Sequence, residues 1–121
     1  MMLATTDRFD AVFAALSDPT RRAIVRRLAD GEATVLELAD PFPISLPAVS
    51  GHLKVLEQAG LISRSRDGQR RPCRLRPGPL VEIAAWAEYT RAAWEQRLVR
   101  LDAYLRRTRH RSTSSPTLEK S

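Results

Sequence analysis

The sequence predicts a mainly α-helical domain with one small β-hairpin, in the order α-α-α-α-β-β-α. Two observations carry this prediction. Apolar residues recur at helical spacing in five segments, and between the last two of these segments Asp67-Gly68 separates two short stretches with strand character. Because Asp-Gly is among the strongest short signals for a hairpin turn, this part of the chain is expected to pair with itself.

Composition limits the domain count and the partners. The 121 residues carry 20 Lys and Arg against 14 Asp and Glu, a formal net charge of +6. This length supports one compact domain, and the basic balance favours nucleic acid or an anionic membrane surface as partner. No apolar run reaches the roughly 20 residues that span a bilayer, and the first residues lack a secretory signal pattern, so we expect a cytoplasmic protein without membrane contact.

The first two helices are expected to meet near Asp18. A helical pattern begins at Asp7, which can cap it, and Asp18-Pro19 restarts the helix with a new cap and a proline at the first position. The second helix is expected to end at Asp30-Gly31.

A capping box predicts the third helix. Thr34 is followed three residues later by Glu37, which opens a short helix over Val35 to Asp40, and Pro41-Phe42-Pro43 forces the chain out of it. This helix positions the turn into the next one.

The fourth helix runs directly into the hairpin. Ser45 is the expected cap, the helix spans residues 45–58, and Gly60 stops it. An apolar stripe faces inward and leaves a polar, mildly basic face outside. Residues 61–66 and 70–75 then form the two strands of the hairpin, which we call the wing.

A long last helix is predicted from Leu80 to Arg107. Its apolar stripe is longer than one small domain can bury, so we expect a homodimer that packs the first and last helices of two copies together. Residues 1–107 form the domain, and residues 108–121, rich in Ser, Thr and charge, form a disordered basic and polar tail. The predicted dimer interface holds Phe9, Phe13, Trp86, Tyr89, Trp94, Leu98, Leu101 and Leu105.

Three motifs in this order resemble the ArsR/SmtB family of winged helix-turn-helix regulators. They are Asp18-Pro19-Thr20-Arg21-Arg22, the run from Ser45 to Leu53, and Ala59-Gly60-Leu61. The resemblance covers roughly Phe9 to Leu105. It implies a dimer that binds a palindromic operator in double-stranded DNA and regulates transcription, usually as a repressor released by an effector, which the sequence does not identify.

Physical reasoning leads to the same mechanism. An α-helix fits the major groove, and a symmetric dimer presents two such helices about 34 Å apart, one turn of DNA. The expected contacts of the fourth helix are Ser45, Leu46, Pro47, Ser50, Gly51, His52 and Lys54. A second set is expected on phosphates or in the minor groove: Thr20, Arg21, Arg64, Arg66, Arg70, Arg71 and Arg74.

Few direct contacts between side chains and bases are expected. Where relatives often carry long polar side chains, this chain has Leu46 and Gly51. Both replacements remove groups that make bidentate contacts to bases, so DNA shape and the remaining polar residues are expected to carry more of the specificity.

Metal sensing, well known in the family, is not expected. The third helix lacks a Cys-x-Cys pair and the last helix lacks the Asp-x-His pattern of zinc sensors, so we predict no metal and no cofactor. His52 is interpreted as a structural or phosphate-contacting residue, and Cys73 as a small apolar wing residue with a redox sensor as the alternative. Trp86 and Trp94 belong to the dimer core or line an effector pocket.

Two function classes stay open. The leading one is a dimeric DNA-binding repressor. The alternative is a winged-helix module that binds a protein partner through its last helix and binds DNA weakly and without specificity. An enzyme is not expected, because the chain has no Gly-rich phosphate loop and no histidine placed beside a nucleophile.

Overall fold

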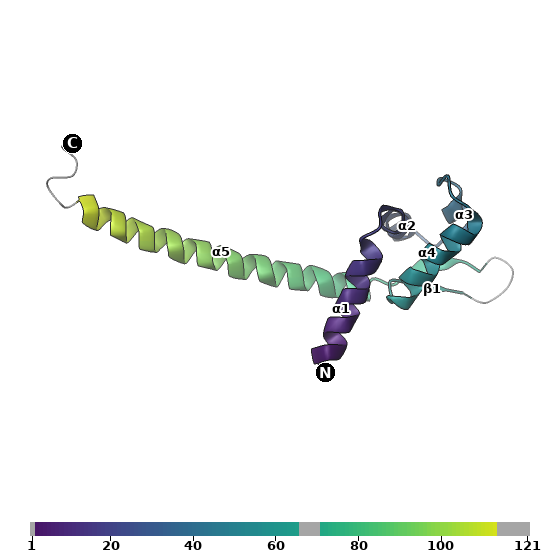
Figure 1. The fold of residues 1–121 in the computed structure, drawn as a ribbon, viewed down its shortest axis with the longest axis horizontal. Helices are drawn as coiled ribbons and strands as arrows, with labels where there is room; N and C mark the ends of the chain where they lie inside the picture. The colour runs from purple at the N-terminus through teal and green to yellow at the C-terminus, as the bar shows by residue number, and fades with distance from the viewer. Residues whose placement is uncertain (1, 66–70, 114–121) are drawn as a thin grey trace. The chain divides into compact units, whose positions relative to one another are not determined.

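The computed structural model describes residues 2–65 and 71–113, and side chains within 8–65 and 71–109. The chain divides into two units, Met1–Ile83 and Ala84–Ser121, and each is described by itself. The predicted fold class and element order are confirmed (Figure 1). The elements are α1 (Met2–Leu16), α2 (Pro19–Ala29), α3 (Val35–Ala39), α4 (Leu46–Gln58), β1 (Ile62–Arg64), β2 (Cys73–Leu75) and α5 (Gly78–Thr113).

Three helices begin at the predicted caps. The Asp18 carboxylate accepts the backbone N–H three residues further on, at 3.0 Å, and the Ser45 hydroxyl does the same at 3.2 Å. Thr34 and Glu37 form the predicted reciprocal capping box of α3. Each cap satisfies N–H groups that the first turn of a helix leaves without a partner, which is why these starts are determined locally.

Two helices extend beyond their predicted ends. α1 begins at Met2, so Asp7 lies within the helix and is not its cap. α5 begins at Gly78 and continues past Arg107 to Thr113, so the segment predicted as a disordered tail begins as helix. Met, Leu and Ala at the start of α1 are good helix formers and extend that helix without an apolar stripe. Residues 114–121 lie outside the described part.

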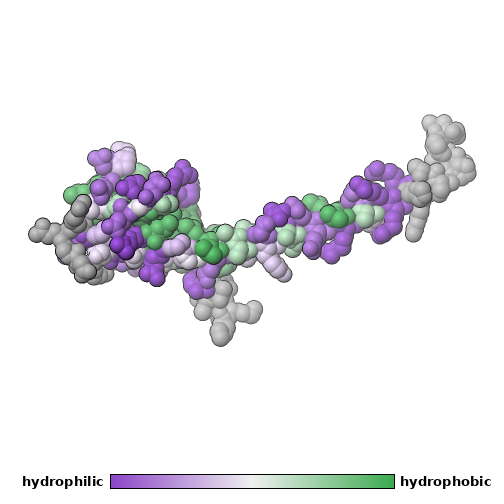
Figure 2. Space-filling model, turned by 180° about the vertical axis from the view of Figure 1, so that it is seen from behind, coloured by the Kyte–Doolittle hydropathy of each residue, from purple (hydrophilic) through white to green (hydrophobic). Residues whose placement is uncertain are grey.

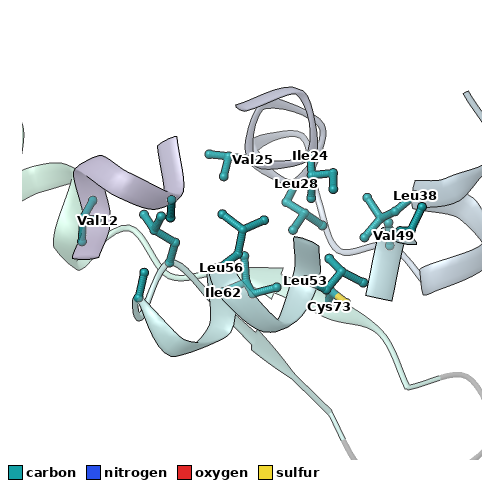
Figure 3. Packing of buried hydrophobic residues seen from close by; sticks show 14 residues of the cluster. Val12, Ile24, Val25, Leu28, Leu38, Val49, Leu53, Leu56, Ile62 and Cys73 are labelled. Carbon is teal, nitrogen blue, oxygen red and sulfur yellow. The ribbon is translucent and has the colours of Figure 1, made fainter. Parts of the chain in front are cut away.

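α4 lies at the centre of the packed core (Figure 3). Its inward residues Val49, Leu53 and Leu56 are fully buried, as their spacing predicts. They pack among buried residues of the neighbouring helices such as Ile24 and Leu38, and α4 contacts α1, α2, α3 and β1. With one side held this firmly, the opposite side of α4 has a defined orientation on the surface of the first unit.

The wing is shorter than predicted and is anchored to the helical part. β1 and β2 pair antiparallel over three residues each, with Arg64 opposite Cys73. The backbone of Cys73 also exchanges two hydrogen bonds with Ala33, at 2.7 and 3.1 Å, so the segment before α3 joins the hairpin. Pro72 has no N–H for the ladder, which limits the second strand. The predicted Asp67-Gly68 turn lies outside the described residues.

Gly60 is expected to be sensitive to substitution, because it ends α4 in a left-handed conformation. Its φ is +79°, and the N–H groups of Gly60 and Leu61 bond to the carbonyls of Glu57 and Leu56, both at 3.0 Å, which closes α4. Replacing Gly60 by alanine should lower the free energy of unfolding by about 1 kcal/mol in urea denaturation. Gly51→Ala, in open space within the same helix, should instead raise it by about 0.5 to 1 kcal/mol. Equal effects would contradict the assignment of Gly60 as the helix end.

Candidate nucleic-acid interface

The outward side of α4 carries the residues predicted to contact bases. Leu46, Pro47, Gly51 and Lys54 are exposed, and Ser50 and His52 are partly buried. The hydroxyl of the remaining residue, Ser45, accepts the Ala48 N–H and so fixes where the helix begins. This surface is small, and Lys54 is the only Lys or Arg of α4. The backbone of DNA could approach this surface closely, whereas few of its side chains are able to form hydrogen bonds with a base.

His52 extends toward the start of α2. Its Nδ1 lies 3.2 Å from an Arg21 guanidinium nitrogen and 3.9 Å from a carboxylate oxygen of Asp18. The backbone N–H of Arg21, more than the nearby charges, holds the pKa of Asp18 below its ordinary value, against a smaller opposing effect of burial. The stabilisation from this cap is therefore present above the ordinary carboxyl pKa and is lost as pH falls through the lowered pKa.

Arg21 was predicted to contact DNA phosphates, but its guanidinium lies within a network of protein acceptors. Nε donates to the Ala15 carbonyl at 2.7 Å, and a terminal nitrogen donates to the Ala14 carbonyl at 3.3 Å. These carbonyls lie at the end of α1, where a cation is favoured by the helix dipole. Arg22 makes a similar bond, to the Leu16 carbonyl at 2.8 Å. Thr20, predicted beside them, lies partly buried in the first turn of α2.

The described wing arginines differ in their surroundings. Arg74 donates to a carboxylate oxygen of Glu32 at 2.6 Å, an ion pair that was not predicted. Arg64 is partly buried and lies beside the Cys73 thiol. Arg71 is exposed and adopts φ +42°, a left-handed backbone that a non-glycine residue rarely takes. The two further wing arginines, 66 and 70, lie outside the described residues.

Cys73 fits the apolar interpretation. It is fully buried, and burial raises the pKa of its thiol against a smaller opposing effect of Arg64. Because the thiolate is the reactive form, alkylation by iodoacetamide should be slower in the folded chain than in the urea-unfolded chain by about a hundredfold or more. Mass spectrometry over time measures both rates. Similar rates in the two states would contradict the burial and favour the redox alternative.

Metal ligands are not grouped in the part of the chain that the structure describes. Its His, Cys, Asp and Glu residues form no cluster of three or more that could hold an ion. None of the described helices is long and apolar enough to cross a bilayer, and this includes the 36-residue α5.

The residues predicted for the dimer interface lie on the surface. Phe9 and Phe13 pack edge to face, with ring centroids 6.3 Å apart, and Phe13 is exposed. The predicted interface residues of α5 are 45–77% exposed, and apolar residues recur among charged ones along its length (Figure 2). The charged residues pair within the helix, as Arg91 does with Glu88 and Glu95. An apolar surface of this extent is typical of an interaction site.

Known protein sequences similar to this chain are transcriptional regulators. A family model described as a helix-turn-helix domain matches residues 16–64. The HTH-type transcriptional regulator Rv2034 of Mycobacterium tuberculosis is 50% identical over 74 residues, which cover 61% of this chain and 69% of that protein. The transcriptional repressor SdpR of Bacillus subtilis is 50% identical over 58 residues, which cover 48% of this chain and 64% of that protein.

Solved structures agree with the fold. The crystal structure of the ArsR family transcriptional regulator RHA00566 has a TM-score of 0.69 and 40% identity, covering 73% of this chain and 97% of that chain. The homodimeric winged helix-turn-helix DNA-binding domain of Mb0332 from Mycobacterium bovis has a TM-score of 0.61 and 26% identity, covering 75% of this chain and 84% of that chain.

Proposed function

Because the chain belongs to the ArsR family of winged helix-turn-helix transcriptional regulators, we propose that it is a homodimeric repressor of an inverted-repeat operator. Membership makes it a DNA-binding regulator of transcription and not an enzyme. The observation that carries the finer proposal is α4, whose inward side is fully buried while its outward side is exposed. We infer that this helix enters the major groove in the cytoplasm of its cell.

The proposed dimer rests on the exposed apolar surfaces of α1 and α5. A twofold pair that buries them would present two copies of α4 to successive major grooves about 34 Å apart, and this spacing selects an inverted repeat. The homodimeric domain of Mb0332 supports a homodimer for this chain. We propose no metal cofactor, and any effector that releases the operator is left unassigned.

We assign the proposed DNA contacts to α4 and to the wing in turn. Ser50 and Lys54 would contact bases or nearby phosphates, while Leu46 offers an apolar contact to a thymine methyl group and Gly51 allows close approach of the backbone. Flanking phosphates or the minor groove would be contacted by a second set of residues, which are Thr20, Arg71 and the arginines at 64, 66, 70 and 74. Arg64 and Arg74 would have to give up their present neighbours to do so.

A gel-shift titration tests the proposal against the alternative of a protein-interaction module. Purified protein is titrated on its own upstream region and on scrambled DNA at two salt concentrations, with footprinting of shifted bands. A protected inverted repeat, bound about a thousandfold more tightly than scrambled DNA, is expected. Equal, steeply salt-dependent binding to both DNAs would overturn it and favour the module that uses α5 to bind a protein.

Substitutions at the outward side of α4 test the contact assignment. Ser50→Ala and Lys54→Ala should each weaken operator binding about tenfold and reduce the preference over scrambled DNA, because each removes a polar group from the recognition surface. Competition gel shifts measure the preference. Arg26→Ala, which removes an exposed cation from α2 outside the proposed interface, should leave it unchanged. An unchanged preference in both α4 variants would show that the assignment is wrong.

A further inference from the structure

The atoms around His52 decide which ring nitrogen carries its proton. A guanidinium nitrogen of Arg21 lies 3.2 Å from Nδ1 of His52. A guanidinium remains protonated in proteins and can only donate, so Nδ1 must accept in this bond. The neutral ring then carries its proton on Nε2. Asp18, at 3.9 Å from Nδ1, is beyond hydrogen-bond distance and does not compete for an Nδ1 proton.

The second nitrogen of His52 reaches the surface. No hydrogen bond to Nε2 is found among the described residues, where His52 bonds through Nδ1. Every buried side-chain nitrogen or oxygen in the same part of the chain has a hydrogen-bond partner. Since Nε2 has none there, it must be accessible to solvent. The His52 side chain is 23% exposed, on the helix that we propose enters the major groove. Nε2 therefore presents an N–H donor there that has no partner among the described residues.

We propose that Arg21 is a positioning residue for DNA recognition, which holds His52 in the tautomer whose Nε2–H donates to an acceptor atom of the operator. This inference rests on the proposed function. DNA offers such acceptors as phosphate oxygens and as purine N7 atoms. Arg21 itself is held by the Ala14 and Ala15 carbonyls, so its guanidinium is fixed at the end of α1. The recognition helix is thereby tied to one of the two helices of the proposed dimer interface.

The tautomer is measured on the protein alone. Nitrogen-15 NMR of the full chain is recorded at about pH 8, where an ordinary imidazole is neutral. His110→Gln in every sample leaves His52 as the only histidine, since the chain has two. The Nε2–H form is expected. An Nδ1–H form would overturn the proposal, and this measurement needs no substitution at Arg21.

Two matched substitutions test whether Arg21 causes this preference. Arg21→Met keeps an unbranched side chain without donors, and the tautomers should mix. Arg22→Met loses a bond to the Leu16 carbonyl but leaves the Arg21–His52 pair, so the Nε2–H form should persist. An unchanged tautomer in folded Arg21→Met would overturn the positioning role.

A double-mutant cycle on the operator tests the consequence for DNA binding. Arg21→Met and His52→Leu should each weaken binding about tenfold, and the double variant should bind no more weakly than His52→Leu alone. Losses that multiply would overturn the proposal. An equal loss on operator and scrambled DNA identifies a phosphate as the acceptor, and a loss on the operator alone identifies a purine.

The failure of the proposed function is distinguishable from that of this inference. If the parent chain does not prefer its operator over scrambled DNA, the proposed function is wrong, and the donor role of His52 toward DNA is wrong as well. If the parent prefers its operator but His52 is an Nδ1–H donor, the inference alone fails.

Discussion

Replacing Leu53 by alanine is expected to lower the free energy of unfolding by about 2 to 5 kcal/mol. Leu53 is fully buried on the inward side of α4, the helix that contacts α1, α2, α3 and β1. The substitution removes buried methyl groups and leaves a cavity that these neighbours can fill only in part. Since small domains are stable by about 5 to 15 kcal/mol, the loss is a large share of the total. Urea denaturation followed by circular dichroism measures it.

Val55 provides the matched control for this experiment. It lies two residues further along α4, on the exposed side, with 36% of its surface accessible. Val55→Ala should change the free energy of unfolding by less than about 1 kcal/mol, because little buried surface is lost and alanine favours a helix. Similar losses at both positions would contradict the orientation of α4 and the proposed DNA-contacting surface that depends on it.

The elements that could be predicted from the sequence depend on residues close together in it. A cap joins a side chain to a backbone three residues away, which is why the starts at Asp18, Thr34 and Ser45 were found. The orientation of α4 could be predicted for the same reason, since the spacing of its apolar residues determines which side is buried. The outer ends of α1 and α5 carry no such signal, and both helices extend beyond the predicted bounds.

The contacts that escaped prediction join distant segments. The Ala33–Cys73 bridge and the Arg74–Glu32 ion pair each connect residues about 40 positions apart, and neither leaves a periodic pattern. Arg21 is a similar case. It stands among several arginines that look alike in the sequence, and its role depends on where α1 ends in space. Identifying the Arg21–His52 contact therefore required the tertiary structure, whereas the orientation of α4 could be predicted from the sequence.

Replacing Leu98 by glutamate is expected to convert the proposed homodimer into a monomer and to weaken operator binding by about a hundredfold to ten-thousandfold. Leu98 is 45% exposed on α5 and lies in the apolar surface of that helix. In a twofold interface the substitution occurs twice and brings two carboxylates into a surface that would exclude water. Binding at one half-site then no longer favours binding at the other, since the two copies of α4 belong to separate molecules. Sedimentation velocity and gel shifts measure both effects.

Gln96→Glu separates the effect of position from the effect of charge. Residue 96 is exposed on the same helix but lies outside the apolar stripe, so the added charge should leave both the dimer and the operator affinity intact. Thermal unfolding should stay cooperative in both variants, because neither residue belongs to the buried core of the first unit. A Leu98→Glu chain that remains dimeric and binds its operator tightly would mean that the two copies associate through another surface. A parent chain that is monomeric while it binds an inverted repeat would contradict the dimer itself.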